Sequence, residues 1–433
     1  MKVSMISLGC CKNQIDAEMM LSTIQNGGFE LCGDVGDVVI INTCGFIQPA
    51  KEEAIENILE MAKLKEEDRV KAIIVTGCMA ERYKEQILEE MPEVDAVVGI
   101  GSNDKICDAI NQVLAGKTYK SFDKKECLSL NGERVLTTLP HYAYIKVAEG
   151  CDNCCSYCAI PSIRGRFRSR KIEDILKEAE FLAKNGVKEL IVVAQDTTRY
   201  GEDLYGEYKL AELLKQLAKI DGIQWIRTLY CYPDKITDEL IQVMETEPKV
   251  LKYLDIPIQH CNKEVLKAMN RKDVDLKALF AKLKDKNFTI RTTVITGFPG
   301  ETNEQFEELC EFCQEIKFDR LGCFAFSPEE GTKAYTMENQ IDEDIKQNRC
   351  DILMEIQNNI LFAKNEEKIG KEIEVIVDGF DKYAECYIAR SKDDAPEIDC
   401  NVFFTSENSH IMGDFVKVNI EEVMDYDLIG KEC

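Results

Sequence analysis

The chain has 433 residues, with 54 Lys and Arg against 79 Asp and Glu, and its net charge of −25 disfavours nonspecific binding to nucleic acid, which needs cations to neutralise phosphates. No uncharged apolar run approaches the ~18 residues of a membrane helix, and the N-terminus lacks a hydrophobic signal region, so we expect a cytoplasmic protein of about three domains. Its 20 cysteines are then expected to be metal ligands and buried thiols, because the cytosol keeps thiols reduced.

Residues 1–117 are predicted to form an open parallel βα domain. Three short apolar runs are each followed by an amphipathic helical pattern, as in parallel βα units. A glycine and a cysteine follow each run, and the cysteines Cys10, Cys44 and Cys78 are 34 residues apart both times. Loops after the strands of an open parallel sheet gather at its carboxyl edge, so the three thiols are expected to converge. The runs are residues 3–8, 38–42 and 72–76.

Residues 118–139 are interpreted as a linker, because they are poorly patterned and contain a charged turn. Residues 140–366 again alternate apolar runs with helical patterns. Six such runs, with no evident seventh or eighth, predict a partial (β/α) barrel. The segment 329–367 is predicted to be helical. The six predicted strands are residues 143–147, 189–194, 225–231, 253–257, 289–296 and 320–326.

The last segment, residues 367–433, changes to an alternation of period two and is predicted to form a small all-β barrel. Residues 366–433 carry 7 Lys and Arg against 18 Asp and Glu. Phosphate would be repelled by such a domain, whereas a basic protein would be attracted. A plainer interpretation is that the acidic residues only keep the domain soluble.

The strongest chemical signal is the Cys-x3-Cys-x2-Cys spacing of Cys151, Cys155 and Cys158. Three thiolates on one loop can bind three irons of a cubane cluster and leave the fourth iron open to a ligand. A zinc knuckle would need a fourth Cys or His, and the neighbours Cys154 and Cys155 are poor co-ligands of one tetrahedral ion. Spacing alone also permits Cys151-x2-Cys154-x3-Cys158.

Cys-x3-Cys-x2-Cys at the start of a partial βα barrel resembles the radical S-adenosylmethionine (SAM) enzymes, and this resemblance makes Cys155 the ligand. Over nearly the whole chain the sequence resembles the methylthiotransferases of that group. Their scheme breaks SAM with one electron, and the 5′-deoxyadenosyl radical so formed abstracts hydrogen from carbon. The motifs that carry the resemblance are Ser7-Leu-Gly-Cys-Cys-Lys-Asn13, Asn42-Thr-Cys-Gly-Phe46, Thr76-Gly-Cys78, Ile160-Pro-Ser-Ile-Arg-Gly165 and Gly297-Phe-Pro-Gly-Glu301.

The resemblance implies two 4Fe-4S clusters, with Cys10, Cys44 and Cys78 holding the second. That cluster carries sulfur, which accepts a methyl group from another SAM and is delivered to the substrate. The family usually has proline where this chain has Cys11, so a second thiol lies beside a ligand here. An electron donor and a sulfur donor are implied partners. The resemblance also places a turn near SAM, made of Gly297, Phe298, Pro299, Gly300 and Glu301.

The family divides by substrate, which is either an adenosine of tRNA or an aspartate of the twelfth protein of the small ribosomal subunit. The segments around Cys10, Cys44 and Cys151, together with Ala194-Gln-Asp-Thr-Thr198, look like the ribosomal-protein branch, whereas the tRNA branch more often has Gln-Met-Asn after its first cysteine. The expected activity is methylthiolation of the aspartate β-carbon in a basic ribosomal protein with two molecules of SAM, and tRNA is less favoured.

Three alternatives remain open on the sequence alone. One is a tRNA adenosine methylthiotransferase. The second is a cobalamin-dependent radical methylase, which would usually offer a histidine in its N-terminal domain, but residues 1–140 contain none. The third is a non-enzymatic iron-sulfur carrier, which would not cleave SAM.

Three other groups of residues can be explained either by a functional role or by an ordinary structural one. Residues 164–171 contain five cations. If the segment is extended, one face carries Arg164, Arg166, Arg168 and Arg170 and can bind a carboxylate. The plain alternative is that these cations pair with local acids. Cys310 and Cys313 follow helical spacing and are predicted to be core thiols. His260 follows a predicted strand and is assigned no role.

Overall fold

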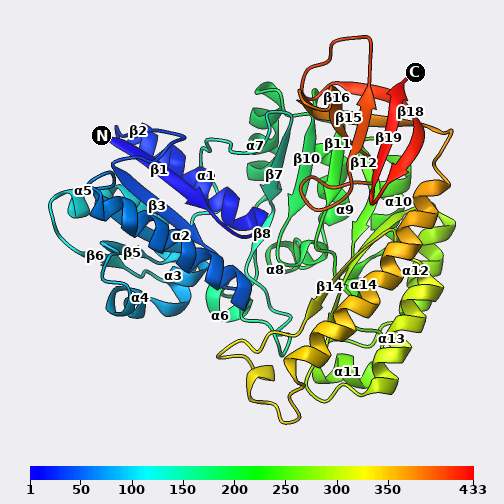
Figure 1. The fold of residues 1–433 in the computed structure, drawn as a ribbon, viewed down its shortest axis with the longest axis horizontal. Coiled ribbons are helices and arrows are strands. Elements are labelled where there is room, and N and C mark those ends of the chain that lie inside the picture. The colour runs from blue at the N-terminus through cyan, green and yellow to red at the C-terminus, as the bar shows by residue number, and fades with distance from the viewer. The chain divides into compact units, whose positions relative to one another are not determined.

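The structure is a computed structural model that describes residues 1–433, coloured along the chain in Figure 1. The chain divides into two compact units. None of its helices has the length and apolar character needed to cross a membrane. The first unit comprises Met1–Thr137, Ala148–Arg170 and Ser327–Tyr335, and the second comprises Thr138–Val147, Lys171–Phe326 and Thr336–Cys433.

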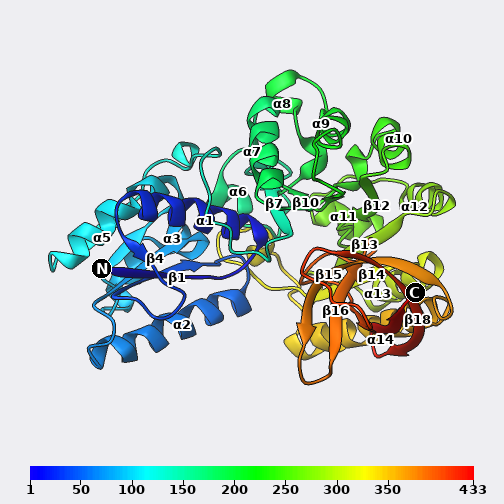
Figure 2. The same ribbon diagram turned by 90° about the horizontal axis from the view of Figure 1, so that it is seen from above.

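The first unit is built on a six-stranded parallel sheet with the order β2-β1-β3-β4-β5-β6. Its central strands β3 and β4 are buried along their whole length, because α1 and α5 pack on one face and α2 packs on the other (Figure 2). Residues of α3 and α4 belong to the same core as those of α2. The elements are β1 (Lys2–Ser7), α1 (Cys11–Asn26), β2 (Glu30–Leu31), β3 (Val38–Thr43), α2 (Gln48–Glu66), β4 (Ala72–Gly77), α3 (Cys78–Tyr83), α4 (Glu85–Glu90), β5 (Ala96–Val98), α5 (Ile106–Leu114) and β6 (Tyr119–Ser121).

Three strands of this sheet are not among the predicted runs: the short buried strand β5 and the two edge strands β2 and β6. Strand β2 pairs with β1 over two residues only, and β6 extends the sheet from β5 although it lies in the predicted linker, residues 118–139. Both strands are short and partly exposed. Edge strands of this kind carry no continuous apolar run, so no sequence pattern marks them.

The second unit contains another six-stranded parallel sheet, with the order β14-β13-β12-β11-β10-β7. These are the six predicted strands, and helices including α7, α9, α10 and α12 lie along one side of the sheet (Figure 2). The elements are β7 (Tyr142–Lys146), α7 (Ile172–Lys184), β10 (Glu189–Val193), α8 (Glu202–Tyr205), α9 (Leu210–Leu217), β11 (Trp225–Thr228), α10 (Asp238–Thr246), β12 (Val250–Asp255), α11 (Lys263–Ala268), α12 (Leu276–Asp285), β13 (Thr289–Thr296), α13 (Asn303–Ile316), β14 (Arg320–Ala325) and α14 (Glu343–Glu366).

The prediction of a helix over residues 329–367 was wrong at its start, because α14 begins only at Glu343. Residues Ser327–Tyr335 instead belong to the first unit. There the buried carboxylate of Glu329 lies 3.0 Å from Lys51 Nζ and 2.7 Å from an Arg82 nitrogen. These ion pairs join positions more than two hundred residues apart, and helical spacing in the local sequence does not reveal them.

The C-terminal segment forms a closed barrel with the order β15-β16-β17-β19-β18. Its interior is filled by alternating apolar side chains such as Val375, Val377, Val418 and Ile420, which confirms the period-two prediction. The predicted α/β fold class, with an open parallel sheet, a partial barrel and a small all-β barrel, is therefore confirmed. The strands are β15 (Glu372–Asp381), β16 (Cys386–Ser391), β17 (Val402–Thr405), β18 (Phe415–Met424) and β19 (Asp427–Glu432).

Buried ion pairs join this barrel to the amino ends of the second sheet within the second unit. Arg390, in β16, contacts Glu189 at the start of β10 (2.9 Å) and Asp378 in β15 (2.6 Å). Its side chain is 2% exposed and that of Glu189 is fully buried. A second ion pair links Arg320 to Asp394, and Tyr253 Oη donates a hydrogen bond to Asp399 (2.6 Å).

Candidate metal centre

The loops that carry Cys10, Cys44 and Cys78 meet at the carboxyl edge of the first sheet. Gly9 lies so close to Cys44 that a Cβ added to it would be 2.6 Å from Cys44 Cβ and 3.0 Å from its Sγ. Gly77 has φ of 90°, and a Cβ there would be 2.4 Å from the backbone oxygen that precedes Cys44. Only glycine permits both the left-handed backbone and these approaches. The structure thus brings the three predicted loops together.

Gly77→Ala is therefore expected to lower the free energy of unfolding by about 3 kcal/mol, from the positive φ and the steric overlap together. Gly116→Ala is a matched control, because Gly116 also has a positive φ but has nothing within 4 Å of an added Cβ. That variant should lose only about 1 kcal/mol. Urea unfolding of the metal-free protein measures both values, and equal losses would contradict the close approach of the loops.

Two buried asparagines hold the loops in place. The Asn13 amide donates to the backbone oxygens of Leu8 (2.8 Å) and Thr43 (3.3 Å). The Asn42 amide donates to the backbone oxygen of Asn13 (2.8 Å) and to Ser7 Oγ (3.1 Å). Since these bonds cross from the loop after β1 to the end of β3, they fix the position of the first cysteine loop against the second.

The three thiols of this triplet influence one another. Burial, together with the nearby charges of Cys78 and Cys10, raises the pKa of the Cys44 thiol to about 12. Burial also raises the pKa of Cys78, and the Arg164 guanidinium opposes that shift. Thiols that affect one another's titration lie close together, and a metal that binds such thiols displaces their protons.

The Cys-x3-Cys-x2-Cys loop runs between β8 (Ala148–Glu149) and α6 (Ile160–Arg164) in the first unit. It is folded tightly, since a Cβ at Gly150 would be 2.2 Å from the backbone oxygen of Arg166. The backbone N–H of Cys158 donates to the backbone oxygen of Cys155 (3.0 Å). Just before Cys155 the chain turns at Cys154, which is exposed and has φ of 49°.

The two cysteine triplets lie in the same compact unit. Cys78 packs directly against Ala159 and Ile163, and Ala159 follows Cys158 in the chain. The sequence places the second triplet at the start of the central domain, but the segment Ala148–Arg170 packs with the N-terminal sheet. The structure therefore brings one cysteine of the first triplet next to the segment that follows the other.

Arg164 is the polar link between the two triplets. Its guanidinium donates to Cys78 Sγ (3.2 Å) and to Asn13 Oδ1 (3.1 Å). It also donates to Asp16 and lies 3.4 Å from a Glu149 oxygen. The residue is 2% exposed, and these neighbours raise its pKa although burial alone would lower it.

The segment 164–171 is not extended along its whole length, so the condition under which its four arginines would share one face is not met. Arg164 ends helix α6, while Arg168 lies in the short strand β9 (Arg168–Ser169) and donates to the backbone oxygen of Glu126 (2.8 Å). The Arg166 side chain is 82% exposed, whereas Arg170 is buried. A helical turn at the start of the segment breaks the period of two, so each arginine faces different surroundings.

The turn predicted near SAM joins β13 to α13 in the second unit. The Glu301 carboxylate accepts bonds from the N–H groups of Gly297 (2.8 Å) and Phe298 (3.2 Å), and Arg349 donates to its other oxygen (2.9 Å). Burial raises the pKa of Glu301, although Arg349 and the two N–H groups act against it. Pro299 and Gly300 complete the turn, and Gly300 has open space where a Cβ would stand.

His260, which sequence reasoning left without a role, lies fully buried beside this turn. Its Nδ1 accepts a bond from the Asn262 N–H (2.9 Å), which assigns the proton to Nε2, 4.0 Å from Glu301. Burial, with the charge of Arg349, lowers its pKa to about 4. The neutral ring therefore lies beside the turn without a hydrogen bond from Nε2. The position after strand β12 was the only signal in the sequence.

The arrangement of the cysteine loops bears on the kind of metal group that they fit. A zinc site needs its ligands around one ion, whereas a cubane spreads them, because each thiolate binds a different iron. The loops that carry Cys10, Cys44 and Cys78 meet at one edge of the sheet, which fits a group that takes one thiolate from each loop.

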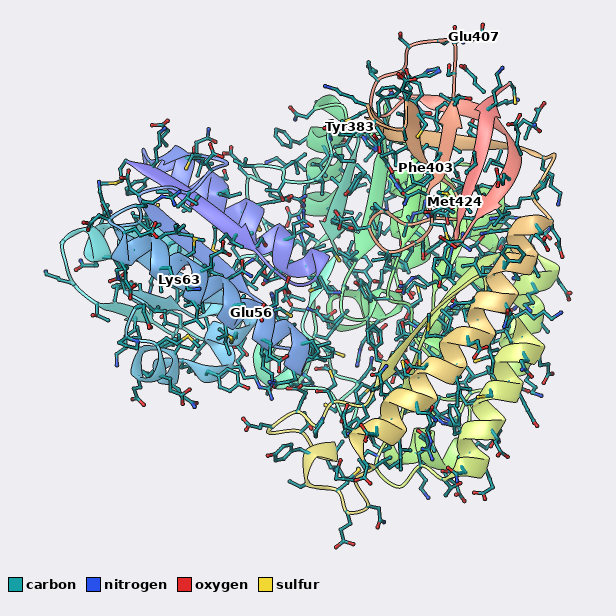
Figure 3. All side chains as sticks on the ribbon, in the orientation of Figure 1. Glu56, Lys63, Tyr383, Phe403, Glu407 and Met424 are labelled. Atoms are coloured by element: carbon teal, nitrogen blue, oxygen red, sulfur yellow. The ribbon has the colours of Figure 1, made fainter.

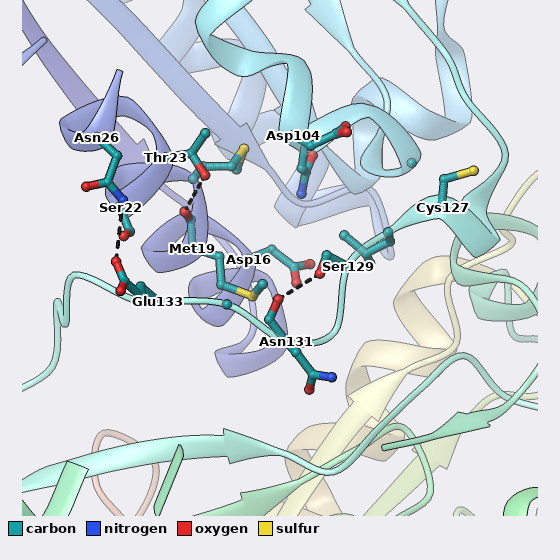
Figure 4. Close-up of a pocket in the computed structure, with 15 residues that line it drawn as sticks. Asp16, Met19, Ser22, Thr23, Asn26, Asp104, Cys127, Ser129, Asn131 and Glu133 are labelled. Carbon is teal, nitrogen blue, oxygen red and sulfur yellow. Dashed lines mark hydrogen bonds between the residues drawn. The ribbon is translucent and has the colours of Figure 1, made fainter. Parts of the chain in front are cut away.

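A cavity of about 340 Å³ opens along α1 in the first unit (Figure 4). Its walls combine apolar groups with polar side chains that include Asp16, Ser22 and Asp104, and Asn26 on one side donates a bond to Glu133 (3.4 Å). Asp16 also pairs with Arg164. The cavity and the cysteine triplets are thus connected through one buried carboxylate.

Comparison with known proteins defines the class. Residues 2–99 match the uncharacterized protein family UPF0004, residues 145–313 match the radical SAM superfamily, and residues 369–432 match the TRAM domain. With the fold and the cysteine loops described above, these matches make the chain a radical SAM methylthiotransferase, an enzyme that uses an iron-sulfur cluster and SAM.

The chain belongs to the ribosomal protein uS12 methylthiotransferase RimO family. It is 48% identical over 435 residues to the member from Thermoanaerobacter sp. (strain X514), covering 99% of each chain. It is also 48% identical to the Clostridium tetani (strain Massachusetts / E88) member, covering 100% of this chain and 98% of that one.

Solved structures show a related fold at low identity. The radical SAM methyltransferase TsrM from Kitasatospora setae, with cobalamin and a [4Fe-4S] cluster bound, is 13% identical with a TM-score of 0.58, and the match covers 77% of this chain and 73% of TsrM. This likeness concerns the fold alone. Residues 1–140 of the present chain contain no histidine.

Proposed function

We propose that this enzyme methylthiolates the β-carbon of an aspartate in ribosomal protein uS12 in the cytoplasm, using two SAM molecules and two 4Fe-4S clusters. One SAM is the methyl donor and the other is the source of the 5′-deoxyadenosyl radical. The observation that carries the proposal is the packing of two separate cysteine triplets in one compact unit, with Cys78 against the residue that follows Cys158. A single cluster would not need the second triplet.

The residues have separate tasks in this proposal. Cys151, Cys155 and Cys158 hold the cluster that cleaves SAM, and Cys10, Cys44 and Cys78 hold the cluster that supplies sulfur. When bound, the two clusters provide one-electron reduction of SAM and a sulfur atom for transfer. The chain contributes the tight glycine turns that fix the loops, and Ala159 and Ile163 keep water from Cys78.

The turn of the second unit is assigned to SAM. Glu301 holds the N–H groups of Gly297 and Phe298 in a fixed direction, and Gly300 leaves the backbone open to close approach. Arg349 fixes Glu301 itself through a bond of 2.9 Å. The rigid turn then presents backbone rather than side chain to the cofactor.

The substrate is assigned from the relatives and from charge. The relatives are named for uS12, and a ribosomal protein is basic. The barrel is acidic and exposes large apolar side chains, among them Tyr383 (100% exposed) and Met424 (47% exposed), with the acidic Glu407 on the same barrel (Figure 3). Such a surface attracts a basic partner and repels phosphate, so tRNA is the less favoured substrate. An electron donor and a sulfur donor complete the reaction.

The test is to incubate the purified, anaerobically reconstituted enzyme with SAM, a reductant and either uS12 or tRNA. We expect uS12 to gain the mass of one methylthio group less the hydrogen that it replaces, located at an aspartate by peptide fragmentation. We also expect 5′-deoxyadenosine and S-adenosylhomocysteine to accumulate together. Label from methyl-labelled SAM that enters tRNA alone would replace the proposal with the tRNA activity, and absence of 5′-deoxyadenosine would favour a cluster carrier.

The choice of Cys155 over Cys154 can be tested with two neighbouring variants. Cys155→Ala is expected to abolish 5′-deoxyadenosine formation, because the cluster loses one of three thiolates. Cys154→Ala should keep it within about twofold, since Cys154 is exposed at the turn of the loop. The reverse result would establish the Cys151-x2-Cys154-x3-Cys158 arrangement. Single-turnover assays with chromatographic detection of 5′-deoxyadenosine measure both.

A further inference from the structure

We propose that Arg164 is a positioning residue for the second cluster, which it holds through Cys78 and whose reduction potential it raises. The inference rests on the proposed function, because it requires a cluster at Cys10, Cys44 and Cys78. Arg164 is contributed by the segment that follows the other triplet, so one residue serves both loops.

The geometry supports this role directly. One guanidinium nitrogen of Arg164 lies 3.2 Å from Cys78 Sγ and 3.1 Å from Asn13 Oδ1. Asn13 in turn donates to the backbone oxygen of Leu8, two residues before Cys10. Arg164 therefore fixes Cys78 and, through Asn13, the loop that carries Cys10.

The other guanidinium nitrogen is held by two acids. It donates to Asp16 and lies 3.4 Å from Glu149, and both acids are almost completely buried. These contacts orient the planar guanidinium group of Arg164, so that the nitrogen not held by the acids points to Cys78 Sγ. A lysine has one flexible ammonium and cannot reproduce the fork.

The electrostatic consequence follows from the position of the donor. A hydrogen bond to a ligand sulfur and a nearby positive charge stabilise the more negative, reduced state of an iron-sulfur cluster. The effect is strong here because Arg164 is 2% exposed and water does not screen it. Removing the N–H bond to Cys78 should lower the potential.

A purely structural role for Arg164 makes a different prediction. If the residue only neutralises Asp16 and Glu149, then Arg164→Lys, which keeps the charge, leaves the potential unchanged. Asp16→Asn separates the two roles further, because it keeps the Arg164 bond to Cys78 and removes a negative charge. Our proposal therefore predicts shifts of opposite sign for these two variants.

The experiment uses the full chain with Cys151→Ala, Cys155→Ala and Cys158→Ala, so that only the second cluster is loaded. Redox titration followed by electron paramagnetic resonance gives the potential, and iron analysis gives the loading. At the midpoint potential of this parent, Arg164→Lys should lower the ratio of reduced to oxidised cluster about tenfold. This corresponds to a decrease of about 59 mV in the potential of a one-electron couple. Asp16→Asn should raise the ratio. Arg166→Lys, at a side chain 82% exposed, is the matched control and should change nothing.

The outcomes distinguish failure of the role of Arg164 from failure of the second cluster itself. Full iron loading with an unchanged potential in Arg164→Lys overturns the role of Arg164 and leaves the second cluster in place. A parent that binds no iron overturns the second cluster and the role of Arg164 with it. If Arg164→Lys itself loads no iron, Asp16→Asn decides, and a ratio that is unchanged or lower in that variant overturns the proposal.

Discussion

Replacing Cys10, Cys44 and Cys78 together by alanine is expected to abolish methylthiolation of uS12 and to leave cleavage of SAM in place. The three loops meet at the carboxyl edge of the first sheet, whereas the Cys-x3-Cys-x2-Cys loop has its own backbone framework. Loss of one set of thiolates therefore removes one cluster and spares the other. The measurement is chromatography of 5′-deoxyadenosine beside mass spectrometry of uS12.

Iron analysis of the same samples gives an independent check. We expect about eight irons per chain in the unmodified protein and about four in each triple variant, since each triplet holds one four-iron cluster. The triple variant at Cys151, Cys155 and Cys158 should lose both products.

The matched control for these variants lies in the same unit. Cys32, Cys107 and Cys127 are also thiols of residues 1–137, but they have no partner loops of this kind. Their combined replacement by alanine should retain both clusters and both products. Methylthiolated uS12 from the variant lacking Cys10, Cys44 and Cys78 would remove the sulfur-supplying role of that triplet.

The second large effect is expected on stability, from Arg390→Met. The substitution removes the cation shared by the buried carboxylate of Glu189, which keeps Arg227 (2.8 Å), and the partly buried carboxylate of Asp378. Removing one partner of a buried ion pair costs about 3–5 kcal/mol, because the other charge stays out of water. Guanidinium unfolding of the metal-free protein measures the loss.

The exposed pair between Lys282 and Asp238 provides the comparison for that variant. Both of these side chains are open to solvent, so Lys282→Met should cause no measurable change in unfolding. A loss in Arg390→Met no larger than in Lys282→Met would show that the barrel does not depend on its buried charges.

The same ion pairs predict a dependence on acid. Burial would raise the pKa of Asp378, but the bonds from His141 and Arg390 lower it, and arginines likewise lower the pKa values of Asp394 and Glu189. Their folded pKa values therefore lie below the unfolded ones. The stabilisation is complete above about pH 4.5 and is lost as the pH falls through the folded values. Arg390→Met should flatten this fall.

Much of the fold follows from local patterns. The apolar runs at β3 and β4 are buried on both faces, so their sequence is continuous and easily recognised. The convergence of Cys10, Cys44 and Cys78 was also predictable, because parallel strands present their carboxyl ends at one edge. Spacing within the chain was sufficient for both.

The features of the site that the sequence did not predict depend on contacts between residues far apart in the chain. The sequence shows Arg164 only as one cation among several, and nothing local indicates that it reaches Cys78, 86 positions away. Glu329 was assigned to a helix because its ion pairs with Lys51 and Arg82 are invisible in a single sequence. Burial of charge is decided by tertiary structure, so its sites are found only in three dimensions.

The ion pairs between the barrel and the second sheet constrain which substitutions the chain can accept during evolution. Arg320 and Asp394 lie 74 positions apart, yet neither tolerates replacement while the other stays charged, because both are buried. We therefore expect such pairs to covary among relatives. A barrel transplanted from another protein would fold beside this sheet only if it brought charges that match Glu189 and Arg320.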